Sequence, residues 1–138
     1  MALARRVGAA EGLVAGQFDP AALDNRFDVV VEASGAIPAF NTALAAVRRK
    51  GRVAILSNIQ PAAAEVALHR IMLREIEVIG SFQFNREFEQ AVRLIESGAV
   101  DLEPLIGASW PLSRLGEALA AMAAAEVNGK IVITPEEG

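Results

Sequence analysis

The sequence contains no cysteine and a single histidine, His69. Without cysteine, the chain forms neither a disulfide nor a zinc site built on thiolates. One histidine cannot hold a structural zinc ion, and a catalytic zinc usually takes three protein ligands. His69 stands next to Arg70 in a stretch that we expect to be an exposed turn. We therefore predict a structural or exposed His69 and no metal site in this chain.

An excess of basic residues and long apolar runs are missing as well. Thirteen Lys and Arg residues against seventeen Asp and Glu residues give a net charge of −4. The chain therefore has no excess of basic residues of the kind that binds nucleic acid. No apolar run approaches the roughly 18 residues of a membrane span, and no secretory signal opens the chain. We expect a cytoplasmic protein with no nucleic-acid or membrane partner. Its 138 residues, 53% of them hydrophobic, fit one globular domain.

Glycine motifs for phosphate are also absent. None of the 11 glycines forms a G-x-G-x-x-G pattern or a Walker-type loop. In a dinucleotide-binding domain, such a turn follows the first strand and holds the pyrophosphate. We therefore expect this chain to lack the pyrophosphate turn of such a domain.

Residues 27–57 predict a strand, a helix and a second strand around which the chain is organised. Residues 27–31 (FDVVV) form a short apolar run typical of a strand buried in a parallel sheet. Apolar side chains then recur at helical spacing, at Ile37, Phe40, Leu44 and Val47. Residues 52–56 begin the second strand. Such crossovers are nearly always right-handed, with parallel strands.

The ends of this helix carry recognisable signals. Ser34 is a candidate N-cap, and Pro38 stands early in the helix, where its missing N–H is harmless. Residues 48–50 (RRK) place cations where the C-terminal end of the helix dipole favours them. Gly51 is then expected to end the helix.

Weaker signals place the other elements. We predict a brief strand at residues 12–15, an extended piece at 65–68, a third parallel strand at 75–80, a helix from an Asn85 N-cap to Gly98, a loop bracketed by Pro104 and Pro111, a last helix capped by Ser113 and a final strand at 131–134. The expected fold class is α/β, with a parallel sheet centred on residues 27–31, 52–56 and 75–80 and helices on both faces. The segment 12–15 is either displaced or lies beside residues 27–31.

The expected ligand site lies beyond the carboxyl ends of the first two strands, at residues 32–35 and 57–58. Ligands of open α/β sheets bind in the crevice at that edge. Glu32 has two interpretations there. It is either a carboxylate that faces a cofactor or a capping residue whose acceptors are satisfied by nearby backbone N–H groups.

Two segments resemble one family. The strand ending VVVEASG and the following GRVAIL resemble the cofactor domain of zinc-type medium-chain alcohol and polyol dehydrogenases. Residues 80–106, GSFQFNREFEQAVRLIESGAVDLEPLI, are similar to the L-idonate 5-dehydrogenase and sorbitol dehydrogenase branch. The resemblance implies that residues 1–138 are the C-terminal part of an incomplete Rossmann-like, doubly wound domain. It implies that residues 107–138 return to the catalytic domain.

The resemblance also implies a site and its cofactors. The cofactor-binding positions it implies are Ala33, Ser34, Leu56, Ser57, Asn58, Ser81, Phe82, Gln83 and Lys130. For Lys130, a solvated lysine at a turn is an equal alternative. The implied cofactor is NAD or NADP in a full-length parent, with zinc only in an N-terminal domain outside this chain. We expect no hydride transfer by this chain alone.

Two functional hypotheses follow. The chain is a fragment of an NAD(P)-dependent polyol or sugar-acid dehydrogenase, or it is a non-catalytic α/β module that binds a partner or itself. In the family, subunits join their sheets edge to edge. The matching residues are 65–67 and 76–82, which predict a homodimer through that edge.

Overall fold

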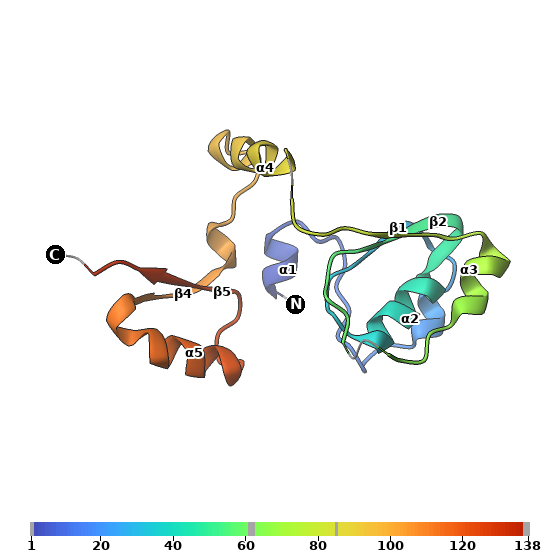
Figure 1. Cartoon of the computed structure of the whole chain (residues 1–138), viewed down its shortest axis with the longest axis horizontal. Coiled ribbons are helices and arrows are strands. Elements are labelled where there is room, and N and C mark those ends of the chain that lie inside the picture. The colour runs from blue at the N-terminus through green and yellow to red at the C-terminus, as the bar shows by residue number, and fades with distance from the viewer. Residues whose placement is uncertain (1, 61–62, 85, 137–138) are drawn as a thin grey trace. The chain divides into compact units, whose positions relative to one another are not determined.

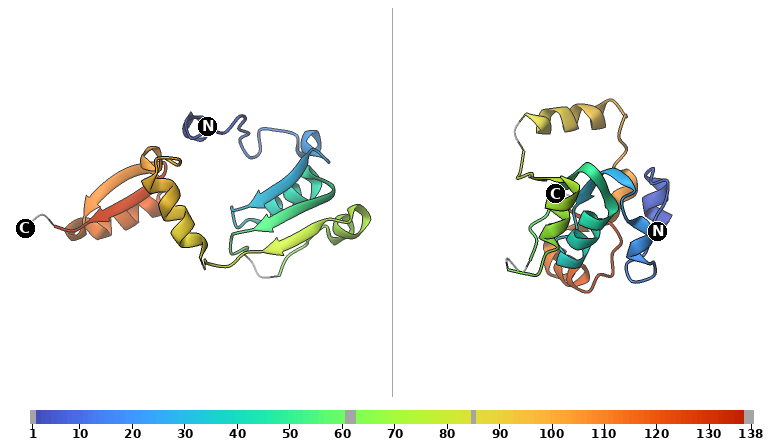
Figure 2. Two further views of the ribbon diagram at one scale, coloured as in Figure 1. Left: turned by 90° about the horizontal axis from the view of Figure 1, so that it is seen from above. Right: turned by 90° about the vertical axis from the view of Figure 1, so that its right-hand side faces the viewer.

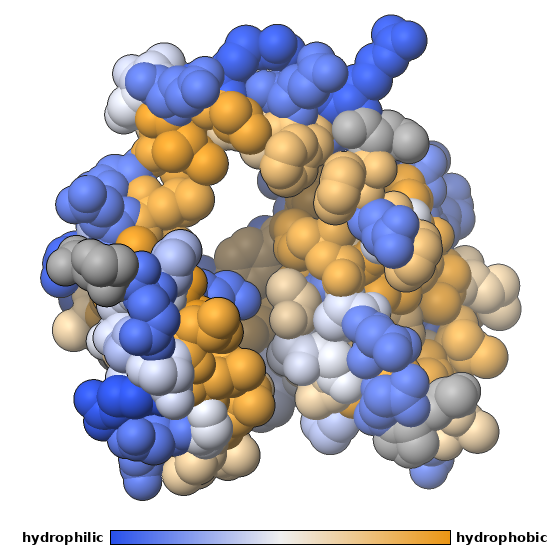
Figure 3. Space-filling model, turned by 60° about the vertical axis from the view of Figure 1, so that its left-hand side comes forward, coloured by the Kyte–Doolittle hydropathy of each residue, from blue (hydrophilic) through white to orange (hydrophobic). Residues whose placement is uncertain are grey.

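A computed structural model describes residues 2–60, 63–84 and 86–136 (Figure 1). The chain divides into two compact units. One is Val14–Phe84, and the other combines Met1–Leu13 with Asn85–Gly138. Apolar side chains remain exposed on both units (Figure 3). No helix in the described ranges is long and apolar enough to cross a membrane.

The unit Val14–Phe84 is built on a three-stranded parallel sheet. Its elements are the 3-10 helix η1 (Pro20–Leu23), β1 (Phe27–Glu32), α2 (Ile37–Ala46), β2 (Val47–Ile55), α3 (Leu68–Arg74) and β3 (Glu77–Gly80). The strand order is β1-β2-β3, and both pairings are parallel (Figure 2). The predicted parallel order of the three strands and the α/β fold class are confirmed, whereas helices were expected on both faces and the described helices α2 and α3 of this unit pack on one face.

The core of this unit lies between the sheet and its helices. Leu44 of α2 and Val47 and Val53 of β2 are fully buried. Ile71 of α3 packs against the same cluster, so α2 and α3 cover one face of the sheet. Val29 and Val31 point the other way along β1, and their side chains are more than half exposed.

The end of α2 differs from the prediction. The helix stops at Ala46, and residues 47–50 already belong to β2. Their cations form ion pairs instead of stabilising the helix dipole: Arg48 Nε donates to Asp28 at 2.6 Å, and Arg49 pairs with Glu75. Gly51 lies inside β2 and does not end the helix.

The predicted strand at residues 12–15 does not form. The predicted extended piece at residues 65–68 ends at Ala67, because Leu68 begins α3, and it pairs with no strand among the described residues. The physical reason is clear for residues 65–67, because the side-chain amide of Asn41 takes the place of a neighbouring strand. Its Nδ2 donates to the Glu65 carbonyl at 3.1 Å, and its Oδ1 accepts from the Ala67 N–H at 3.0 Å.

The second unit contains a two-stranded parallel sheet. Its elements are α1 (Ala2–Arg6), α4 (Glu87–Glu96), η2 (Glu103–Leu105), β4 (Ile106–Pro111), η3 (Leu112–Arg114), α5 (Leu115–Ala123) and β5 (Lys130–Thr134). The predicted final strand is confirmed as β5. The predicted loop before Pro111 is wrong, because Ile106–Pro111 pairs with β5 as β4.

The helix caps of this unit also differ from expectation. Ser113 lies within η3 and does not cap α5, whose N-cap is Arg114. The Ser113 N–H instead donates to Glu136 Oε1 at 2.8 Å. Asn85, the predicted cap of α4, lies outside the described residues. The helix α4 ends at Glu96, close to the predicted stop at Gly98.

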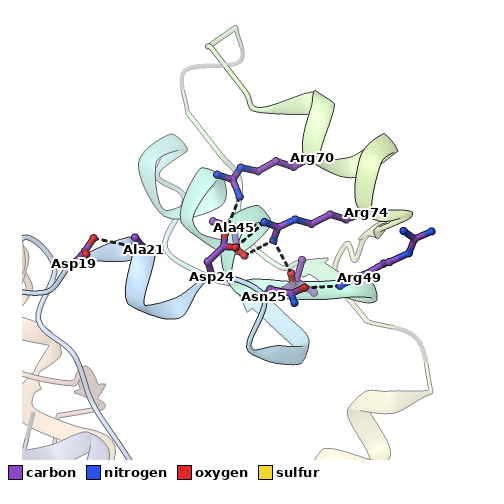
Figure 4. Close-up of polar contacts among 9 residues, drawn as sticks. Asp19, Ala21, Asp24, Asn25, Ala45, Arg49, Arg70 and Arg74 are labelled. Atoms are coloured by element: carbon purple, nitrogen blue, oxygen red, sulfur yellow. Dashed lines mark hydrogen bonds and ion pairs between the residues drawn. The ribbon is translucent and has the colours of Figure 1, made fainter.

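A cluster around Asp24 ties three elements of the first unit together (Figure 4). Arg74 donates to both carboxylate oxygens of Asp24, at 3.0 and 2.8 Å, and to the Ala45 carbonyl at 2.9 Å. Arg70 donates to the same carboxylate at 3.0 Å. The Arg74 hydrogen bond lowers the pKa of Asp24, burial opposes this, and Arg70 lowers the pKa further.

Replacing Arg74 with methionine is therefore expected to lower the free energy of unfolding by about 2 kcal/mol. The substitution keeps the apolar stem but removes charge-assisted hydrogen bonds to Asp24 and to the last turn of α2. Urea unfolding followed by circular dichroism measures the change. The matched control is Arg93→Met, which removes an exposed ion pair with Glu89 at 4.0 Å and should cost about 0.5 kcal/mol or less. Equal losses in the two variants would contradict the prediction.

Candidate functional site

Glu32 is the last residue of β1, and its carboxylate is buried at the carboxyl end of the sheet. The residue is only 3% exposed. Its Oε1 accepts from the Ser34 N–H at 2.8 Å, the Ser34 hydroxyl at 2.6 Å and the Gly35 N–H at 3.1 Å. The capping interpretation of Glu32 is confirmed, because neighbouring backbone N–H groups satisfy this oxygen.

The other carboxylate oxygen of Glu32 reaches the next strand. Ser57, two residues beyond the end of β2, donates its hydroxyl to Glu32 Oε2. The main chains are joined there too, since the Leu56 N–H donates to the Glu32 carbonyl at 2.9 Å. Glu32 therefore links the ends of β1 and β2 through both its side chain and its backbone.

These contacts set the ionisation of Glu32. Burial raises the pKa of its carboxyl group, but the hydroxyls of Ser34 and Ser57 and the N–H groups of Ser34 and Gly35 lower it. The net effect is a pKa below the ordinary value of 4.5. Glu32 is therefore an anion at neutral pH, and each serine hydroxyl must be the donor in its hydrogen bond.

Beyond the strands, the chain segments that follow β1 and β2 stay side by side. The Gln60 N–H donates to the Gly35 carbonyl at 3.2 Å, and Ala36 forms an isolated parallel bridge with Gln60. Gly35 has a φ of +75°, and a Cβ built there would lie 3.3 Å from the Asn58 carbonyl oxygen. Glycine thus permits both the left-handed turn and the close approach.

The end of β3 completes this edge. The register aligns Glu32 with Ile55 and Ile55 with Gly80, so all three strands end together. The Ser81 N–H donates to the Ile55 carbonyl at 2.9 Å. Phe82 is 88% exposed, and Gln83 has a left-handed φ of +55°.

The structure thus brings most of the predicted site residues to one edge of the sheet. These are Ala33, Ser34, Leu56, Ser57, Asn58, Ser81, Phe82 and Gln83. Lys130 is the first residue of β5 and belongs to the other unit, so its role at a cofactor stays a prediction. Sequence reasoning missed the Ser57–Glu32 hydrogen bond, although both residues were placed at adjacent strand ends.

A hollow of about 380 Å³ runs along the outer side of β1 to this edge. Apolar side chains of β1 and α2 line most of it, among them Val31 and Ala43. Glu32, Ala33 and Ser34 line it where β1 ends, and the polar side chains in its lining are those of Glu32, Ser34 and Thr42. At the carboxyl end of β1, the site therefore combines an apolar wall with hydrogen-bonding groups, as small-molecule sites commonly do.

The described residues do not fit a zinc site. Among them, no three His, Cys, Asp or Glu side chains are grouped closely enough to hold a metal ion. His69 lies on α3, where it is exposed as expected.

Comparisons with known proteins agree with this architecture. Residues 2–97 match the zinc-binding dehydrogenase family. L-idonate 5-dehydrogenase (NAD(P)(+)) of Escherichia coli is 37% identical over 93 residues, covering 67% of this chain and 27% of that protein. Sorbitol dehydrogenase of Bombyx mori is 33% identical over 97 residues, covering 70% and 28%.

The structural comparison extends further along the chain. The crystal structure of L-idonate 5-dehydrogenase from Escherichia coli matches with a TM-score of 0.79 and 31% sequence identity, covering 91% of this chain and 37% of that one. In the sequence comparison, the chain spans less than a third of the length of the two curated relatives, L-idonate 5-dehydrogenase and sorbitol dehydrogenase. The matched segment, residues 2–97, includes all three strands that meet at the candidate site. On these grounds, the chain belongs to the zinc-binding dehydrogenase family.

Proposed function

We propose that this chain supplies part of the nicotinamide side of the NAD(P) site in a polyol or sugar-acid dehydrogenase of the L-idonate or sorbitol type. The names of its relatives support this assignment, and so does the place of the site at the carboxyl ends of parallel strands. The zinc ligands and the pyrophosphate turn of such an enzyme would come from outside this chain. We therefore derive no step that involves zinc.

The observation that carries the proposal is a set of free main-chain groups. Within the described residues, no hydrogen bond engages the carbonyls of Leu56 and Ser81 or the N–H of Gln83. A nicotinamide carboxamide has an NH₂ donor pair and a carbonyl acceptor, so two acceptors and one donor complement it. When bound, nicotinamide accepts or gives a hydride. The role of the strand ends is to bind and orient that ring.

The remaining candidate residues have supporting roles in this proposal. The small side chains of Ala33 and Ser34 allow close approach of the ribose, and Asn58 and Phe82 flank the ring. The resemblance implies contact of Lys130 with the pyrophosphate, and a solvated lysine at a turn is an equal alternative.

Titration of the chain with reduced nicotinamide mononucleotide, followed by NMR, tests the proposal. We expect weak saturable binding, with amide shifts concentrated at Ser57, Ser81 and Gln83. We expect no oxidation of idonate or sorbitol by the chain with NAD(P) and zinc, because the metal ligands and the pyrophosphate turn are lacking. Absence of any binding would contradict the proposed site, and zinc-dependent turnover would contradict the expected inactivity.

The alternative function is self-association as a non-catalytic module. It is supported by the position of β3 at the edge of its sheet, where main-chain groups face outward. Residues 65–67 belong to the same unit and are held there by Asn41, and the Val66 N–H has no hydrogen-bond partner within the described residues. A homodimer would use this segment and residues 76–82.

Replacing Val66 with proline tests that interface, because proline deletes the free N–H. We expect the mass measured by analytical ultracentrifugation to fall from dimer to monomer. The control is Val66→Ala, which keeps the N–H and should remain dimeric. A dimer that persists in the proline variant, or a monomeric unaltered chain, would count against this interface.

A further inference from the structure

The peptide between Leu56 and Ser57 is held from both sides by one residue. On its N-terminal side, the Leu56 N–H donates to the Glu32 carbonyl at 2.9 Å. On its C-terminal side, the Ser57 hydroxyl donates to Glu32 Oε2. The carbonyl of this peptide is the free Leu56 acceptor, so its direction depends on the two anchors.

The side-chain anchor is well suited to hold this peptide in place. Glu32 is 3% exposed, and its Oε1 is held by Ser34 and Gly35, so its carboxylate has little freedom to rotate. Ser57 lies beyond the last residue of β2, where strand pairing no longer fixes the backbone. Without the Ser57 hydroxyl, this segment would keep only the hydrogen bond of the Leu56 N–H to the Glu32 carbonyl. The peptide between Leu56 and Ser57 could then rotate and change the direction of the Leu56 carbonyl.

We propose that the Glu32–Ser57 pair is a positioning device that aims the Leu56 carbonyl at the NH₂ group of the nicotinamide carboxamide. This inference rests on the proposed function and adds to it a role for two side chains that need not touch the cofactor. Glu32 and Ser57 act through the peptide between them. Their effect should therefore depend on whether the ligand carries an NH₂ donor.

Two ligands separate positioning from general stability. Reduced nicotinamide mononucleotide carries the carboxamide, and its 3-acetylpyridine counterpart keeps the carbonyl but has a methyl group in place of NH₂. The unaltered chain should bind the carboxamide about twentyfold to thirtyfold more tightly, the effect of two hydrogen bonds from its NH₂ group to the carbonyls of Leu56 and Ser81, each worth about fivefold. In Ser57→Ala, this preference should fall to about fivefold, because the Leu56 carbonyl is no longer aimed and only the Ser81 carbonyl still accepts from the NH₂ group.

Conservative variants complete the test. Ser57→Thr keeps the hydroxyl and should keep the preference. In Glu32→Gln, the three donors that meet Oε1 require the amide oxygen at that position. The amide Nε2 would then face Ser57 and donate to its hydroxyl oxygen, so the hydrogen bond between the two side chains should persist with donor and acceptor exchanged. The matched control Ser97→Ala removes a hydroxyl that donates to the Leu94 carbonyl in the other unit and should change nothing.

The outcomes are distinguishable. If the unaltered chain binds neither ligand, the proposed function fails and this inference fails with it. If it binds with the expected preference and Ser57→Ala keeps that preference, the positioning role is wrong and the proposed site stands. Equal loss of affinity for both ligands in Ser57→Ala would show a purely structural role and would also overturn the inference.

Discussion

Replacing Glu32 with leucine is expected to lower the free energy of unfolding by about 3 kcal/mol. The leucine side chain fills similar space but accepts no hydrogen bond. The hydroxyl of Ser57 and the N–H groups of Ser34 and Gly35 would lose their shared acceptor at a buried position. Each unsatisfied polar group costs roughly 1–3 kcal/mol, less where water can enter. Urea unfolding of the two chains measures the difference.

Glu77→Leu is the matched control for this variant. Glu77 also lies on a strand of the sheet, but its side chain is 63% exposed and pairs with Arg52 at 2.7 Å. Exposed ion pairs contribute about 1 kcal/mol or less, so this variant should lose little stability. A Glu32→Leu variant no less stable than Glu77→Leu would show that the hydrogen bonds of Glu32 contribute nothing to folding.

The acid response of Glu32 gives a second measurement of the same network. Its pKa is lower in the folded chain than the ordinary value of 4.5, which approximates the unfolded chain. The stabilisation from ionised Glu32 is therefore complete above that value and is lost as pH falls through the folded pKa. The stability gap between the unaltered chain and Glu32→Gln should be constant near neutrality and should narrow on acidification. A gap that widens would contradict the direction of the pKa shift.

The elements that local pattern specifies were predicted from the sequence. The apolar run at residues 27–31 is short and β-branched, and it forms β1 as expected. The three parallel strands follow from this pattern and from the handedness of crossovers. Because parallel strands end at one edge of a sheet, the sequence alone predicted that most of the candidate site residues lie close together.

The remaining features depend on contacts between residues distant in the sequence. Asn41 looks like an ordinary polar position of a helix, but its side-chain amide forms the hydrogen bonds to residues 65 and 67 that a neighbouring strand would otherwise form. No local signal marks that pairing, so those residues were predicted to be extended and available. Likewise, the hydroxyl of Ser57 gains its role only because Glu32, 25 residues earlier, ends the neighbouring strand.

The role of Gly51 also depends on a contact with a residue distant in the sequence, and its replacement is the second change for which we expect a large effect. A glycine after three basic residues indicates a helix end, yet here it lies buried inside β2. The register moves from Phe27–Val47 to Val29–Arg52, so residues 48–51 bulge between these two pairs. A Cβ built on Gly51 would lie 2.8 Å from the Asp28 carbonyl oxygen and 2.9 Å from that of Arg48. This is a bulge in which β1 approaches too closely for any side chain.

Replacing Gly51 with alanine is therefore expected to lower the free energy of unfolding by about 3 kcal/mol. The methyl group would also lie 2.6 Å from Val47 Cγ2, a side chain that is fully buried and cannot move aside. Overpacking of this kind typically costs 1–3 kcal/mol, and here the opposing atoms include two backbone oxygens held by the sheet. The matched control is Gly80→Ala in β3, where a Cβ meets nothing within 4 Å. That variant should stay within about 0.5 kcal/mol of the unaltered chain or gain slightly from reduced freedom of the unfolded state. If both alanine variants unfold at the same urea concentration, the bulge accommodates a side chain and the close approach of β1 does not require glycine.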